Sequence, residues 1–247
     1  MTARVSTALR HMKDDEHDFT PVLQAQVHNG RRQGVAQSMA ELAANGIGSI
    51  IAGTDTTGVA LAIGMRSIYL DEAIRSRLHA ELKTIWETES NHPTLPTLEN
   101  LPYLRACVRE CLRFSSPISG RLPRITPQGG LDFAGYYIPE GTTVSSAVYL
   151  MHYDEEIFPE PFRFNPERWL ASVGRDTSRQ EQCLVPFSTG SRGCIGLNIA
   201  QAEIYICLAT MVRWLKGSRV LDSDLKTLVQ FTRSVPGGLK VELVEAE

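Results

Sequence analysis

A single cysteine stands among glycines in the segment Phe187–Gly196, which reads FSTGSRGCIG. Apolar residues at helical spacing follow it, so Cys194 is predicted to lie where a glycine-rich loop enters a helix over residues 194–214. Unpaired backbone N–H groups and the positive end of the helix dipole stabilise a thiolate at such a place. Gly190, Gly193 and Gly196 carry no side chains, so a flat ligand could approach the backbone closely.

The residues around this cysteine limit the kinds of metal site that it could form. Arg192 places a cation two residues before the sulfur, where it suits a carboxylate on the ligand. One thiolate with no Cys or His partner nearby does not form a zinc site, which needs four ligands. It suits a metal centre that takes one protein ligand, such as haem. The alternative interpretation is a buried structural cysteine beside a glycine turn.

The segment resembles the cysteine-ligand loop of the cytochrome P450 family, F-x-x-G-x-R-x-C-x-G, with every fixed position present. The resemblance implies that Cys194 is the axial ligand of haem b iron. It also implies that Phe187 packs beside the thiolate and limits water, and that Arg192 holds a haem propionate. Gly190 and Gly196 would belong to the haem-binding surface.

A second motif lies in a long helix predicted over residues 37–67. The run AGTDTT, residues 52–57, resembles the oxygen-binding stretch of the family's central helix. Gly53 would leave room for a bound diatomic molecule, Thr56 would divert a backbone hydrogen bond, and Asp55 would relay protons. Taken alone, the run would indicate only a helix with a poorly formed middle.

A third motif, Glu110-x-x-Arg113, lies in a helix predicted over residues 98–114. Alone it is an ordinary i,i+3 surface pair. The resemblance implies that both side chains meet Arg168, from a Pro-Glu-Arg-Trp segment, in a network that anchors the core on the cysteine-loop side. Its role would be structural, not catalytic.

Arg124 lies in residues 121–148, where short β-like runs between Gly and Pro predict a small sheet of hairpins. The resemblance offers Arg124 for a haem propionate, with Arg121 as the rival candidate. The alternative for each is a solvated charge on a strand.

The remaining segments predict a mainly α fold with small, segregated β-sheets (α+β). The resemblance implies a single incomplete cytochrome P450 domain over residues 1–247. The other predicted elements are an amphipathic helix at 1–12 (a surface helix, or less favoured, an organelle-targeting signal), a loop at 13–33, a helix at 71–88, a turn-rich link at 91–96, an irregular segment at 152–186 and two strands within 221–244 around Pro236. Cys107, Cys111 and Cys207 lie on apolar stripes and are predicted to pack in the core.

Composition excludes several classes of protein. The net charge of -3 gives no nucleic-acid footprint. Apolar runs such as Ile47–Gly53 and Val59–Met65 are short for a membrane span, so an integral membrane protein is not expected. Five cysteines in a chain of 247 residues indicate reduced thiols in an intracellular setting.

The resemblance implies a haem-dependent monooxygenase of secondary or xenobiotic metabolism. Its substrate would be a small, largely apolar organic molecule, bound near residues 45–51, 117–123 and 231–236, and its electron donor an NADPH-dependent flavoprotein reductase. The resemblance covers the C-terminal half of the family's fold, so one wall of the haem pocket and any endoplasmic reticulum anchor would lie outside these residues. Two alternatives are an inactive fragment that does not hold haem stably and a haem-thiolate isomerase or dehydratase. The intact run Gly53–Thr56 argues against the second.

Overall fold

The computed structural model describes residues 22–88, 90–170, 177–215, 217–221, 228–229, 233–234 and 239–242. The chain divides into two compact units, residues 1–54 and 55–247, and each is described by itself. The helix predicted over residues 1–12 lies outside the described residues.

The first unit contains helix α2 (Val22–Arg32) and the start of α3 (Met39–Leu70). The loop predicted over residues 13–33 is therefore wrong from Val22 onward. Arg31 and Arg32 end α2 where the helix dipole favours cations. Ser38 and Glu41 then form a capping box at the start of α3, with Ser38 N 2.7 Å from Glu41 Oε2.

Helix α3 is continuous through the glycine- and threonine-rich stretch at residues 45–58. The hydroxyls of Ser49 and Thr54 donate to carbonyls four residues earlier, at 2.8 and 2.7 Å, so these polar groups are satisfied without a break in the helix. In the first unit its isoleucines at positions 47, 50 and 51 are exposed, so the helix carries exposed apolar side chains there.

The same helix joins the two apolar runs that were predicted to be too short for a membrane span. Helix α3 is the one helix among the described residues whose length and apolar composition would allow it to cross a membrane. Core helices of soluble proteins meet the same criterion, and the part of α3 that belongs to the second unit contributes Ile68 and Tyr69 to a buried core.

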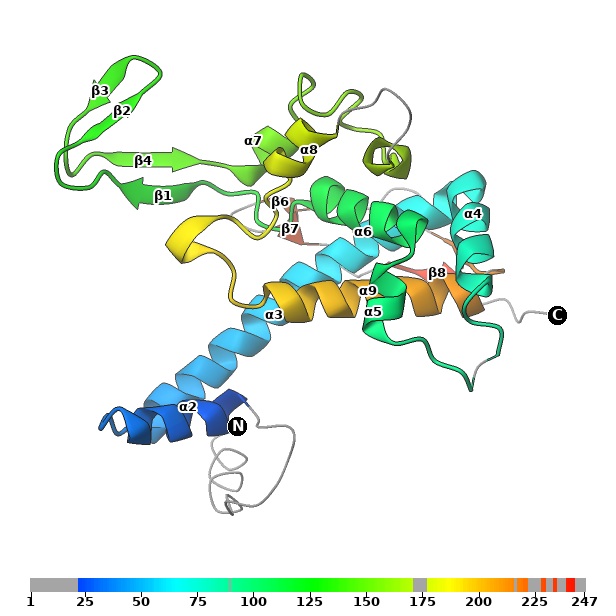
Figure 1. The fold of residues 1–247 in the computed structure, drawn as a ribbon, viewed down its shortest axis with the longest axis horizontal. Helices are drawn as coiled ribbons and strands as arrows, with labels where there is room; N and C mark the ends of the chain where they lie inside the picture. Colours follow the sequence, from blue (N-terminus) through cyan, green and yellow to red (C-terminus); the bar gives the residue numbers. More distant parts are fainter. Residues whose placement is uncertain are drawn as a thin grey trace. The chain divides into compact units, whose positions relative to one another are not determined.

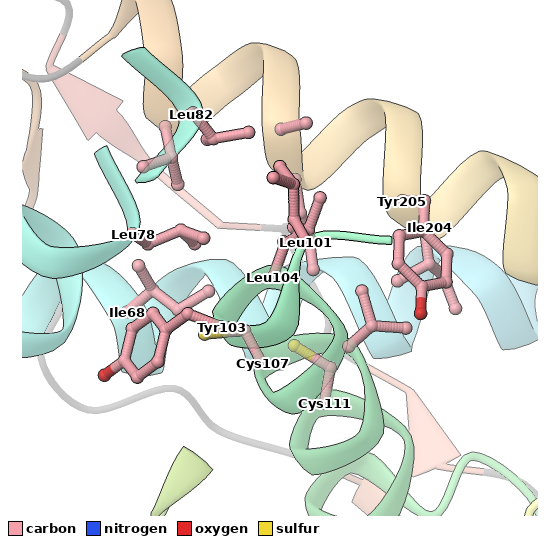
Figure 2. Close-up of a cluster of buried hydrophobic side chains, with 14 of the residues drawn as sticks. Ile68, Leu78, Leu82, Leu101, Tyr103, Leu104, Cys107, Cys111, Ile204 and Tyr205 are labelled. Carbon is pink, nitrogen blue, oxygen red and sulfur yellow. The ribbon is translucent and has the colours of Figure 1, made fainter. Parts of the chain in front are cut away.

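The core of the second unit lies between α3, α4 (Glu72–Lys83), α6 (Pro102–Ser115) and α9 (Leu197–Trp214). Figure 2 shows side chains from these helices packed together, among them Ile68, Leu78 and Leu104. Helix α4 begins where Asp71 accepts from the backbone N–H groups of Ala73 and Ile74, and it ends before the predicted residue 88.

Helices α3 and α6 approach each other closely at a glycine. A Cβ built on Gly64 would lie 2.2 Å from Cys111 Sγ, which is far inside van der Waals contact. Cys107 and Cys111 are both fully buried on α6, so the prediction that they pack in the core is confirmed (Figure 2). Cys207, for which the same was predicted, is only half-buried on α9. The glycine therefore makes room for a core cysteine.

The single helix predicted over residues 98–114 is two helices, α5 (Leu95–Glu99) and α6. Pro102 opens α6, and the preceding Leu101 is extended, with φ -76° and ψ 116°. A proline disfavours helical geometry at the residue before it, which explains the break. The link predicted at 91–96 accordingly ends in α5.

The hairpins predicted over residues 121–148 are confirmed (Figure 1). Strand β1 (Leu122–Ile125) pairs antiparallel with β4 (Thr143–Ser146), and β2 (Leu131–Phe133) pairs with β3 (Tyr136–Ile138). Ala134 and Gly135 close the β2–β3 hairpin with φ values of 51° and 83°, as a tight two-residue turn requires.

Two short elements occupy the described part of the segment predicted to be irregular, the 3-10 helix η1 (Pro166–Trp169) and α8 (Ser178–Cys183). Helix α7 (Val148–His152) leads into this segment, and the 3-10 helix η2 (Gly190–Arg192) follows it. At the C-terminal end β5 (Arg219–Val220) pairs with β8 (Val241–Glu242), and β6 (Leu228–Val229) pairs with β7 (Arg233–Ser234). The one strand pair expected around Pro236 is thus replaced by two pairs, because β8 reaches back to a strand that precedes residue 221.

Candidate functional site

The loop before α9 is closed by its own backbone hydrogen bonds. Ser188 N donates to Val185 O at 3.0 Å, Gly193 N to Gly190 O at 3.0 Å, and Cys194 N to Phe187 O at 2.9 Å. Gly190 has φ 74°, which favours glycine at this position. The loop therefore holds Cys194 by main-chain contacts.

Cys194 is exposed, unlike the buried Cys107 and Cys111. The helix predicted to start at residue 194 begins at Leu197, with Gly196 as its cap, so the cysteine lies just outside the helix. Glycine at the cap position ends the loop without a side chain, which explains the later start. The thiol thus stands near the positive end of the α9 dipole, and its exposure argues against a buried structural cysteine.

The surroundings of this thiol fit a flat ligand with one axial bond. A Cβ built on Gly196 would lie 3.7 Å from Cys194 Sγ and 3.8 Å from Ile199 Cγ2, so the thiol and Ile199 flank the glycine. Ile195 and Ile199 are 103% and 65% exposed, giving an apolar surface beside a single sulfur donor. This donor set fits haem, whose iron takes a cysteine thiolate as axial ligand.

The other predicted haem contacts flank the loop or lie apart from it. Phe187 is half-buried and packs against the core of the second unit. Arg192 is exposed at the end of η2, with no hydrogen bond or ion pair shown to any residue that the structure describes. Arg124 is exposed on β1, where its guanidinium donates to the carbonyl of Pro123 at 2.8 Å, and Arg121 just before β1 is also exposed. No hydrogen bond shown within the described ranges joins either of these two arginines to the Cys194 loop.

The predicted proton relay lies on α3. Asp55 is exposed and Thr56 is half-buried, and both belong to the second unit. Gly53 is exposed in the first unit, and a Cβ built on it would meet nothing within 4 Å. Helix α3 is continuous through Thr56, and the diverted backbone hydrogen bond there stays a prediction.

Glu110, Arg113 and Arg168 come together in the interior, where all three are buried. Glu110 Oε1 accepts from Arg113 Nη2 at 2.8 Å and from Arg168 Nε at 3.2 Å, and Glu110 Oε2 accepts from Arg113 Nε at 3.0 Å. The arginines also donate to backbone carbonyls, including those of His152 and Pro159. The network ties α6 to the segment around η1, as the resemblance implied.

Comparison with known proteins identifies the family. The family model for cytochrome P450 matches residues 3–230. The chain belongs to the cytochrome P450 family. It is 45% identical over 165 residues to cytochrome P450 monooxygenase macH of Penicillium terrestre, covering 66% of this chain and 32% of that protein. It is 44% identical over 155 residues to cytochrome P450 monooxygenase BOT1 of Botryotinia fuckeliana, covering 63% and 29%.

A third relative covers more of this P450 chain. Fusicoccadiene C-8 hydroxylase of Alternaria brassicicola is 38% identical over 191 residues, which are 75% of this chain and 36% of that protein. The chain spans about a third of the length of the curated relatives that it matches.

Several residues of the P450 network were missed from the sequence. Asn165 N donates to Glu110 Oε1 at 2.9 Å, and Trp169 Nε1 donates to Glu110 Oε2 at 2.8 Å. Trp169 directly follows Arg168, so a buried indole with a polar end next to a predicted network residue was an available signal. His152 is also buried and bonded on both ring nitrogens, but no local pattern marks it.

A cavity of about 320 Å³ borders the cysteine loop of this P450 chain. Residues 184–189 line one side of it, and Val108, Leu112 and Leu197 are among the residues of α6 and α9 on the other sides. Residues 184–189, which lead into the loop, are therefore separated from α6 in part by this cavity.

Proposed function

We propose that this chain carries the haem-thiolate centre of a monooxygenase that inserts one atom of dioxygen into a small, largely apolar organic molecule. The observation that carries the proposal is the exposed Cys194 thiol, in the family's loop pattern, at the N-terminal end of α9. The relatives named above as monooxygenases or as a hydroxylase support it, and their fungal sources favour a role in secondary metabolism.

In this proposal the chain's own residues hold and orient the cofactor. Cys194 would bind the haem iron through its thiolate, Gly190 and Gly196 would leave room for the cofactor, and Phe187 would limit water at the sulfur. Arg192 would pair with one propionate, and Arg124, or its rival Arg121, with the other. Haem b, when bound, supplies the activation of dioxygen, one atom of which enters the substrate while the other leaves as water.

The distal side would use α3. Asp55 is exposed, so its carboxylate can exchange protons with solvent, and the neighbouring Thr56 hydroxyl can pass a proton inward. Gly53 leaves space beside the helix. An NADPH-dependent flavoprotein reductase is the proposed electron donor, and the endoplasmic reticulum is the proposed location of the whole protein.

The test is the absorption spectrum of the reduced, carbon-monoxide-bound chain, expressed with ample haem precursor. We expect the thiolate-type Soret band in the unaltered chain and its loss in Cys194→Ala. Cys183→Ala is the matched control, because Cys183 is half-buried outside the loop and its loss should leave the band intact. Haem binding that survives in Cys194→Ala with the same band would overturn the proposal. A chain that takes up no haem would favour the alternative of an inactive fragment.

A further inference from the structure

His152, the last residue of α7, is fully buried, and both of its ring nitrogens are bonded. Nδ1 lies 3.0 Å from Ser116 Oγ, which follows the end of α6. Nε2 lies 3.1 Å from the backbone nitrogen of Val185, which leads into the Cys194 loop. The imidazole thus bridges two segments that are far apart in sequence.

The partners fix which nitrogen carries the proton. A backbone N–H only donates, so Nε2 accepts from Val185 and is unprotonated. Nδ1 then carries the proton and donates to Ser116 Oγ, while the Ser116 hydroxyl donates to the Arg113 carbonyl at 2.9 Å. Burial, and secondarily the Arg113 guanidinium, lower the pKa of His152 to about 4, so the ring is neutral at neutral pH.

Val185 is where the loop's own hydrogen bonds begin. Its N–H is held by His152, and its carbonyl accepts from Ser188 N at 3.0 Å. Two residues later the Phe187 carbonyl accepts from Cys194 N. Residues 184–189 border the cavity of about 320 Å³, so the hydrogen bond to His152 acts where side-chain packing is incomplete.

The arginine network reaches the same histidine from its other side. Arg113 Nη1 donates to the His152 carbonyl at 2.8 Å, and Arg113 is bonded to Glu110. A continuous path of contacts therefore runs from Glu110 through Arg113 and His152 to the Val185 amide. We propose that His152 is a positioning residue for the Cys194 loop, which it joins to the buried arginine network by accepting the Val185 N–H. Any effect of His152 on haem binding rests on the proposed function, whereas the hydrogen bond between His152 and Val185 is independent of that function.

The test is amide hydrogen exchange of the full, haem-free chain at neutral pH. In His152→Asn the shorter side chain still reaches Ser116 but not Val185. We expect exchange at the Val185, Ser188 and Cys194 amides to rise about tenfold, as loss of one buried hydrogen bond allows, with the α9 amides unchanged. His152→Gln places an amide oxygen near the position of Nε2, and it should restore most of the protection.

Ser116→Ala is the matched control, since it removes the other ring contact and leaves the Val185 contact in place. Loop exchange within about twofold of the unaltered chain is expected there. Unchanged loop exchange in His152→Asn, or an equal rise in the loop and in α9, would overturn the proposal. Nitrogen NMR of the unaltered chain gives a measurement that needs no variant, since a protonated Nε2 would also overturn it.

The haem spectrum separates this inference from the proposed function. If the unaltered chain binds haem through Cys194, His152→Asn should show a smaller share of the thiolate-type band than His152→Gln, and equal shares would count against the positioning role. If the unaltered chain binds no haem, the proposed function fails while the exchange experiment still decides the role of His152.

Discussion

The interior around Glu110 and the surface around Cys194 lie in the same unit but differ in how their polar groups are satisfied. Every oxygen of Glu110 accepts hydrogen bonds from buried donors, and those donors come from the described residues of this chain. Cys194 and Arg192 face outward, beside the exposed side chains of Ile195 and Ile199. The first region holds itself together, whereas the second presents groups that suit a ligand.

This difference separates stability from function along the chain. A buried charge that loses its partner costs far more than an exposed side chain that is truncated. Substitutions at the network should therefore change the free energy of unfolding, and substitutions at the loop should change ligand binding at nearly constant stability. The predictions below test this separation, from the largest expected change in unfolding free energy to the smallest.

Glu110→Gln should have the largest effect. The substitution keeps the shape of the side chain but leaves Arg113 and Arg168 buried without their counter-charge, which typically costs about 3–5 kcal/mol. Urea unfolding followed by circular dichroism measures the change. Glu181→Gln is the control, because Glu181 pairs with Arg109 near the surface, and its loss should cost no more than about 1 kcal/mol. Equal losses in the two variants would refute the difference drawn between the regions.

Acid should weaken the chain through His152. Its pKa is about 4 when folded and 6.5 when unfolded, so the unfolded chain takes up the proton first. The neutral ring therefore contributes fully to the free energy of unfolding above about pH 6.5. As the pH falls from there to 4, the free energy of unfolding decreases by about 3 kcal/mol in total. The measurement is the unfolding free energy of the unaltered chain minus that of His152→Gln across this range. A constant difference would show that the ring does not titrate with a lowered pKa.

Gly64→Ala should cost about 1–3 kcal/mol, because the new methyl group would collide with Cys111 Sγ in the core. Gly58→Ala on the same helix is the control. Gly58 is exposed and has no neighbour within 4 Å of a built Cβ, so alanine there should add about 0.5–1 kcal/mol of stability. Thermal unfolding compares the two, and Cys111→Ala should rescue Gly64→Ala. Stabilisation by both alanines would mean that the helices are not in close contact.

The sequence predicted the features that depend on short-range pattern. The Cys194 loop and the hairpins of residues 121–148 follow from local glycine, proline and apolar patterns. The spacing of Glu110 and Arg113 alone predicts only a surface pair, and it was the resemblance that implied their buried position. Family resemblance, rather than periodicity, supplied Arg168 as the third member of the network. Pro102 carried the signal for the break between α5 and α6, but the apolar spacing across it suggested one helix.

Long-range contacts were out of reach of such patterns. His152 bonds to Ser116 across 36 residues, and Trp169 bonds to Glu110 across 59 residues. Gly64 is needed because α3 meets α6 at Cys111, a crossing that no periodicity along one helix encodes. The identity of such residues is determined by tertiary packing, so they could be recognised only from the positions of the helices in the structure.

The smallest effect on stability should come from Cys194→Ala. The side chain is exposed and precedes α9, so its truncation removes little buried surface and should change the unfolding free energy of the haem-free chain by less than about 0.5 kcal/mol. The same substitution should abolish the thiolate-type haem spectrum, since the chain then lacks the proposed axial donor. Urea unfolding and haem titration of one preparation measure both. A large loss of stability would show that Cys194 belongs to the folded scaffold, and the loop would then be a structural element like the network around Glu110.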